Sequence, residues 1–306
     1  MWRTAFILGL IICVPALTNA QSHGRAKAPA PLGMSEKSAF VQSVRAGDVK
    51  NCRLMLARGA DPNTESASGA PVLVLAARAG GFALVHLLLD AGARVDADDR
   101  NSYSALHHAA QAGDLRLVNL LLARGADVNK LGYDQHTILM FAAHGANWMR
   151  LPRPMRDLMQ RADAHEGGEG LMPSRFGTPG AYRRVVARLL AAGAEVNVVA
   201  DCGETALTFA TCDLKLTRML LGAGARVDYG WSPLCLLDDR GQEKLSAANL
   251  EEFEGVAGLK RRRALMRSLR RWVAETAPER REVTRLLVAA GATRDNCGDD
   301  EDEPKN

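Results

Sequence analysis

Residues 104–129 read SALHHAAQAGDLRLVNLLLARGADVN, and this stretch contains two helical patterns separated by a short polar turn. The first pattern, at 105–112, is rich in alanine, and small side chains allow helices to approach one another closely. The second pattern, at 115–122, places leucine and valine at helical spacing. Ser104 can cap the first helix, and Gly125 supplies the left-handed conformation that ends the second. The stretch therefore predicts a pair of packed helices.

The same pattern returns along the chain at a nearly constant period. The glycine that ends the second helix recurs as Gly59, Gly92, Gly125, Gly193, Gly224 and Gly291. Two intervals are 33 residues and one is 31, whereas the intervals of 68 and 67 residues exceed 33 by 35 and 34. Such a period is typical of an array whose units bury their apolar faces against their neighbours. We predict an all-α solenoid of about six helix-turn-helix units.

Two insertions of about 35 residues interrupt this period, in units 4 and 6. We place both between the two helices of their unit, near residues 146–180 and 242–278. The repeat array itself is expected to span residues 36–295. The acidic residues that follow, at 296–306, predict a disordered tail.

A tetrapeptide with a capping Ser or Thr opens several of the units. It reads Ser104-Ala105-Leu106-His107, Thr137-Ile138-Leu139-Met140, Thr205-Ala206-Leu207-Thr208 and Ser232-Pro233-Leu234-Cys235. With the period, it resembles the ankyrin repeat family, whose helix-opening motif is Thr-Pro-Leu-His. The resemblance covers residues 36–295 apart from the insertions. It implies a scaffold that binds another protein through its concave surface, loops or insertions, and that is not an enzyme.

The first twenty residues have the layout of a secretory signal peptide. Arg3 gives a positive start, an apolar run extends over residues 5–17, and Ala20 ends the segment with a small side chain. The apolar run is shorter than the roughly 20 residues that cross a bilayer. We expect cleavage after Ala20, export to the periplasm and a flexible linker at 21–35; an uncleaved anchor is the alternative.

The first insertion begins with three candidate partner-binding residues, Trp148, Met149 and Arg150. Aromatic, methionine and arginine side chains are enriched at the centres of protein interfaces. The same apolar side chains would also serve to cover the flank of the stack. Residue type does not decide between these two roles.

The second insertion predicts an amphipathic basic helix at residues 259–273. Leu265, Leu269 and Trp272 share one face. The candidate partner-binding residues of this helix are Arg263, Arg267, Arg270 and Trp272. The helix can dock on the repeats, contact an acidic partner or lie on an anionic membrane surface.

Other classes of function find little support. A net charge of +4 over 306 residues does not indicate nucleic-acid binding. No catalytic, nucleotide-binding or metal-binding motif occurs, so we expect no catalytic, cofactor or metal site. Exported bacterial proteins that resemble this chain include immunity partners that block a toxic effector, which makes an immunity-type inhibitor the specific expectation. An envelope stress-protection or structural factor is the alternative.

Overall fold

The structure is a computed structural model, and it confirms the predicted all-α repeat architecture. It describes residues 34–150, 153, 156, 177–201, 203–211, 213–230 and 259–293. Within these ranges it contains helices and three isolated β-bridges, but no strand. The predicted signal peptide at 1–20, most of the linker at 21–35 and the tail at 296–306 lie outside the described residues.

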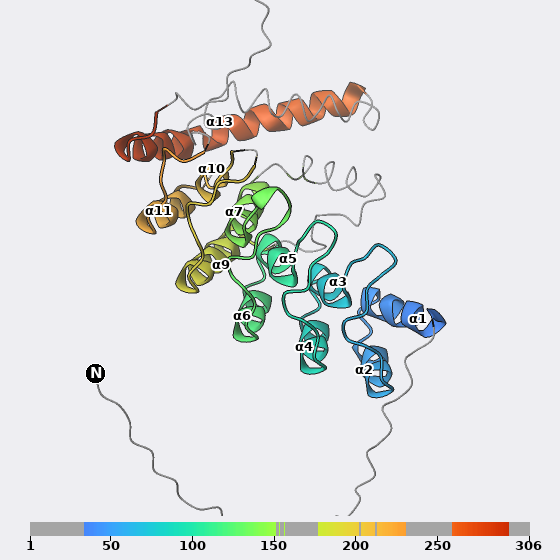
Figure 1. The fold of residues 1–306 in the computed structure, drawn as a ribbon. Coiled ribbons are helices and arrows are strands. Elements are labelled where there is room, and N and C mark those ends of the chain that lie inside the picture. The colour runs from blue at the N-terminus through green and yellow to red at the C-terminus, as the bar shows by residue number, and fades with distance from the viewer. Residues whose placement is uncertain are drawn as a thin grey trace, which may run out of the picture.

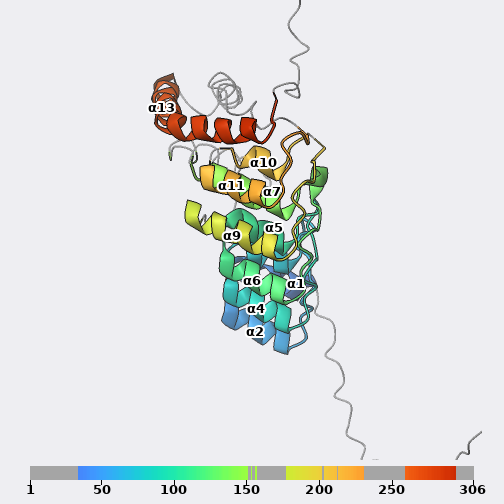
Figure 2. The ribbon, with the colours of Figure 1, turned by 90° about the vertical axis from the view of Figure 1, so that its left-hand side faces the viewer.

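The helices form two layers, which Figures 1 and 2 show from two sides. The layer of first helices contains α1 (Met34–Arg45), α3 (Val72–Arg78), α5 (Ala105–Ala112), α7 (Ile138–Trp148) and α10 (Ala206–Phe209). The layer of second helices contains α2 (Val49–Ala57), α4 (Phe82–Asp90), α6 (Leu115–Ala123), α9 (Pro179–Ala191) and α11 (Leu214–Gly222). The last helix, α13 (Leu259–Ala289), packs on α11. A short 3-10 helix, η1 (Tyr133–Gln135), lies in the loop before α7.

The repeated cap residues explain where the helices begin and end. The Thr137 hydroxyl accepts a hydrogen bond from the Met140 N–H at 3.1 Å and so caps α7. Asp114 caps α6 in the same way, by accepting from the Leu117 N–H at 3.1 Å. Gly125, which follows α6, has a φ of 83°, the left-handed conformation that the sequence predicts for this turn.

A single hydrophobic core runs through the stacked helices. Ala109 and Ala110 of α5 are completely buried, and their small size lets α5 pack closely on α3 and α7. In α6, Leu121 is completely buried, whereas Leu120 is partly buried against the core. The leucine pattern therefore identified the buried face of the second helices.

Asparagine side chains tie the turn of one unit to the turn of the next. The Asn129 side-chain oxygen accepts from the Glu195 N–H at 2.8 Å, and its amide donates to the Gly193 carbonyl at 3.1 Å. We call these contacts asparagine clamps; they are made by Asn63, Asn129 and Asn197. The Asn129 clamp spans the first insertion, so units 3 and 4 stack as neighbours despite the extra residues.

The first insertion leaves unit 4 at the end of α7 and returns at the start of α9. Most of residues 151–176 lie outside the described part, so the predicted bounds of this insertion, near residues 146–180, stay a prediction. The returning chain is fixed by the Gly177 N–H, which donates to the Ala112 carbonyl at 2.7 Å.

The chain is helical around Pro278, near the predicted end of the second insertion. The basic segment and the second helix of unit 6 form one continuous helix, α13, with Pro278 inside it. A proline removes one backbone hydrogen bond and crowds the preceding turn, which bends a helix without necessarily ending it. Figures 1 and 2 show that α13 changes direction along its length. Among the described helices, none is both long and apolar enough to span a membrane.

Candidate functional site: a central pocket between three units

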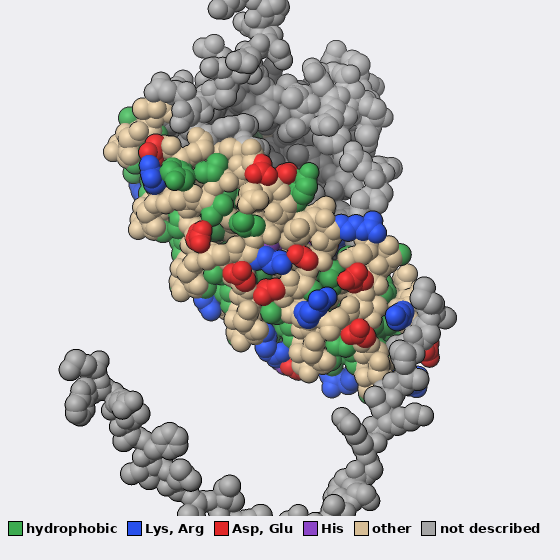
Figure 3. Space-filling view, viewed as in Figure 1, with side chains coloured by type: hydrophobic (Ala, Val, Ile, Leu, Met, Phe, Trp, Pro, Cys, Tyr) green, Lys and Arg blue, Asp and Glu red, His purple; other side chains and the backbone are tan. Residues whose placement is uncertain are grey.

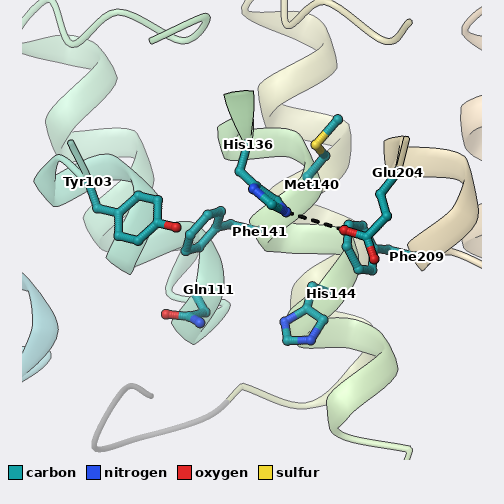
Figure 4. A pocket seen from close by; sticks show the side chains of 8 residues that line it. All are labelled: Tyr103, Gln111, His136, Met140, Phe141, His144, Glu204 and Phe209. Atoms are coloured by element: carbon teal, nitrogen blue, oxygen red, sulfur yellow. Dashed lines mark hydrogen bonds and ion pairs between the residues drawn. The ribbon is translucent and has the colours of Figure 1, made fainter. Parts of the chain in front are cut away.

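A pocket of about 300 Å³ opens between α5, α7, α10 and the loops that precede them. It is lined by Tyr103, Gln111, His136, Met140, Phe141, His144, Glu204 and Phe209, which we call the central pocket. Figure 4 shows these side chains, which come from three consecutive units. Figure 3 shows the surface of the stack in the orientation of Figure 1, with charged and apolar side chains interspersed.

The register of the repeat places these residues together. Tyr103, His136 and Glu204 each come directly before the residue that caps a first helix. Phe141 and Phe209 each lie four residues after such a cap. Because units stack in the same orientation, equivalent positions of successive units lie side by side. The pocket therefore combines one position that changes from unit to unit, occupied by Tyr103, His136 and Glu204, with one that repeats as Phe141 and Phe209.

Aromatic rings form the wall of the central pocket. The Tyr103 and Phe141 ring centroids are 4.8 Å apart at an interplanar angle of 65°. His144 meets Phe209 edge-on, with centroids 5.3 Å apart. Edge-to-face pairs of this kind are favourable and hold the rings in fixed orientations. The wall is therefore preorganised and not assembled from mobile side chains.

Polar side chains lie between the aromatic rings of the pocket lining. The His136 Nε2 lies 3.4 Å from the Glu204 Oε2. This hydrogen bond is the main reason that the pKa of His136 is raised above its ordinary value. Burial, in contrast, lowers the pKa of His144. Gln111 is 4% exposed, and within the described part its side-chain oxygen has no hydrogen-bond donor.

The arrangement is suited to binding. Among the described residues, no group of three or more His, Cys, Asp or Glu side chains could hold a metal ion. The pocket lining contains no serine, threonine or cysteine nucleophile. Its rigid aromatic wall and few polar groups are the features of a recognition pocket.

The predicted residues of the first insertion have contacts inside the protein. The Arg150 guanidinium donates to both carboxylate oxygens of Glu279 in α13 and lies 3.7 Å from Asp213. Met149 packs partly against the hydrophobic core. Trp148 ends α7, but its side chain lies outside the described residues. Arg150 therefore joins unit 4 to the last helix, and none of these contacts involves the central pocket.

The predicted residues of the basic helix belong to α13. Trp272 is only 7% exposed, as expected for an apolar face that is covered. The side chains of Arg263, Arg267 and Arg270 lie outside the described residues, although their backbone is helical. Their role in binding a partner stays a prediction.

The central pocket was missed by motif searching, because its residues form no motif along the chain. The pocket residues could have been found by comparing the same repeat position in successive units. The residues that directly precede the caps of units 2 to 5 are Ala70, Tyr103, His136 and Glu204, so this position changes from small to aromatic to charged.

A model of the ankyrin repeat family with 3 copies of the repeat matches residues 40–132 and 73–150. No curated protein matches the chain. The matched residues include α3 to α7, which contribute six of the eight pocket residues with their preceding loops. Ankyrin repeats generally serve as scaffolds for binding other proteins, and typically have no catalytic role. The helix pairs, the turn glycines and the family match agree: this chain is an ankyrin-repeat protein.

Proposed function

We propose that this protein is a periplasmic scaffold that binds one partner protein at the central pocket, and that the partner is a toxic effector which it inhibits. The observation that carries the binding role is the concentration of rings in one place. Only 5% of the chain is aromatic, yet Tyr103, Phe141 and Phe209 line the same pocket. Aromatic side chains in preorganised pockets dominate the binding energy of protein interfaces.

The stacked units support this role by making the pocket rigid. The Asn129 and Asn197 clamps and the edge-to-face rings fix the three units relative to one another. A partner that binds there loses less free energy to the ordering of the scaffold than it would on a mobile surface. Tight, stoichiometric capture is what an inhibitor of a toxic protein requires.

Export is the second part of the proposal, and residues 1–20 support it. Sequencing the N-terminus of the protein recovered from periplasmic extract should give a chain that begins at Gln21. Recovery of an intact N-terminus in detergent-extracted membranes would instead support the uncleaved anchor.

Photo-crosslinking from two positions tests the binding site. A benzoylphenylalanine in place of Phe209 lies in the pocket, whereas the same group in place of Leu54 lies on the exposed side of α2. We expect a crosslinked protein from position 209 and none from position 54. A partner that crosslinks equally from both positions would contradict the pocket as the site.

The inhibitor role needs its own measurement. The crosslinked partner, once identified and expressed alone in the periplasm, should arrest growth, and co-expression of this protein should restore it. If the partner is harmless, the scaffold role stands and the immunity role fails.

A further inference from the structure

We infer that the central pocket receives an arginine side chain of the partner protein. This inference rests on the proposed function, and it adds the chemistry that the pocket recognises. Three independent features of the pocket point to a planar cation: its ring faces, the sign of the surrounding charge and its unpaired acceptor.

The ring faces provide the first argument. Phe141 lies between Tyr103 and His136, and Phe209 lies beside Glu204 on the other side of the opening (Figure 4). A guanidinium group stacks on aromatic faces and is attracted by their negative electron density. This chain already uses the interaction on its surface, where the Arg116 guanidinium lies 4.5 Å from the Phe82 ring centre.

The surrounding charge provides the second argument. Glu204 lines the pocket directly. Burial raises the pKa of the Tyr103 hydroxyl, and the negative charges of Asp134 and Asp99 raise it further, so both carboxylates act at the pocket. The nearby cation Lys130 is paired with Asp98 at 2.9 Å. The carboxylates of Glu204, Asp99 and Asp134 therefore outnumber the single cation that His136 forms when it is protonated, and the balance favours a positive side chain.

Hydrogen bonding provides the third argument. The Gln111 side-chain oxygen lacks a donor within the described part of the chain, and the Glu204 carboxylate accepts only hydrogen bonds when ionised. An apolar occupant would take the Glu204 carboxylate out of water and would leave the buried Gln111 oxygen without a donor, and both are costly. Arginine carries five N–H donors in one plane, whereas lysine carries three and has no flat face. An arginine side chain can therefore stack on the rings and donate hydrogen bonds to the acceptors at the same time.

The experiment titrates the full-length protein with three small probes. N-acetyl-arginine amide is the expected ligand, N-acetyl-lysine amide tests charge without the flat face, and N-acetyl-norleucine amide tests bulk without charge. Binding is followed by the Met140 methyl resonance in the NMR spectrum, which lies in the pocket and is assigned with Met140→Leu. We expect a saturable shift with a Kd of about the millimolar range for the arginine probe, at least about tenfold weaker binding of the lysine probe, and no shift with norleucine.

Two isosteric variants identify the acceptor. Glu204→Gln removes the negative charge of the pocket lining and should weaken the binding of the arginine probe about tenfold or more. Glu195→Gln removes an exposed carboxylate in the turn after α9 and should leave binding unchanged. Thermal melts of both variants report whether each remains folded.

Two results would overturn the inference. One is a norleucine probe that binds as tightly as the arginine probe, and the other is an arginine probe that produces no saturable shift in the folded protein. Equal binding by Glu204→Gln would also overturn it. These outcomes are separate from failure of the proposed function. If a partner crosslinks at position 209 but the arginine probe does not bind, the scaffold role is supported and the arginine inference is wrong.

Discussion

The Tyr182 hydroxyl in α9 donates a hydrogen bond to the Gln111 backbone carbonyl in α5 at 2.8 Å. Tyr182 is completely buried, and the two residues are 71 positions apart in the sequence. The contact joins the helix that follows the first insertion to the unit that precedes it. It also holds the backbone of Gln111, whose side chain lines the central pocket.

Gly145→Ala should destabilise the protein at this contact. A Cβ on Gly145 would lie 2.4 Å from a Tyr182 ring carbon and 2.7 Å from the Gln111 carbonyl oxygen, closer than atoms can pack. Overpacking of this kind costs about 1–3 kcal/mol. Urea unfolding followed by circular dichroism measures the loss. Gly180→Ala is the matched control, since its Cβ meets nothing closer than 3.9 Å, and it should be neutral or slightly stabilising.

Asp213→Asn should cost about 1–3 kcal/mol of unfolding free energy, because it removes charge-assisted hydrogen bonds. Asp213 is buried, and it caps α11 by accepting from the Leu216 N–H at 3.0 Å. Its carboxylate also accepts from the Arg183 Nε at 3.0 Å and lies near Arg150. Asparagine keeps the cap and loses the ion pairs.

Asp114→Asn makes the same change at the equivalent cap of α6, where the carboxylate accepts from backbone N–H groups. Because Asn and Asp cap helices about equally well, this variant should be nearly neutral. Equal melting temperatures for the Asp213 and Asp114 variants would show that the ion pairs contribute nothing.

Acidification should destabilise the protein through His107. This histidine is completely buried, and burial lowers its pKa to about 3. The unfolded chain takes up a proton near pH 6.5, whereas the folded protein does not. The contribution of neutral His107 to the free energy of unfolding is therefore fully present above about pH 6.5 and is lost as the pH falls toward 3. His144, whose pKa is also lowered, contributes with the same sign, and His136, whose pKa is raised, with the opposite sign.

His107→Thr should flatten this dependence without removing the helix cap. His107 Nδ1 accepts from the Ser104 N–H at 3.1 Å, and Thr208 makes the same bond to Thr205 in unit 5 at 2.9 Å. Chemical unfolding between pH 4 and about 7 gives the slope for each variant. An unchanged slope in His107→Thr would contradict the assignment.

Two variants in α13 separate a docked helix from a free one. Trp272→Ala should lower the melting temperature and cost about 3 kcal/mol, because a buried ring is removed. Arg263→Glu combined with Arg267→Glu should leave the melting temperature unchanged. If Trp272→Ala instead melts like the wild type and no longer binds anionic liposomes, the helix is a membrane contact.

The sequence predicts the helix pairs well because their determinants are local. Gly125 and Asp114 act within their own turns, and Leu121 repeats at helical spacing, so each can be identified without the structure. The central pocket could not be predicted in this way. Tyr103 and Glu204 line the same pocket only because three units stack, and their positions are those where the repeat has no preferred residue.

The continuity of α13 through Pro278 could not be predicted from the sequence, for a different reason. Proline disfavours the interior of a helix. The carboxylate of Glu279 binds Arg150, which follows α7, and accepts from the Leu214 N–H of α11 at 3.0 Å, and these tertiary contacts fix the helix one residue after Pro278. Those contacts link segments far apart in the chain, and no local pattern reveals them.

The asparagine clamps have a consequence for how such a chain can evolve. Asn63, Asn129 and Asn197 each bind backbone atoms of the following turn, and no side chain of that turn is required. Loss or duplication of one whole unit presents each clamp with an equivalent backbone. The gene can therefore shorten or lengthen by complete units while each junction that carries a clamp keeps its hydrogen bonds. Only the units that carry the central pocket are excluded from this freedom, since their order determines which side chains meet.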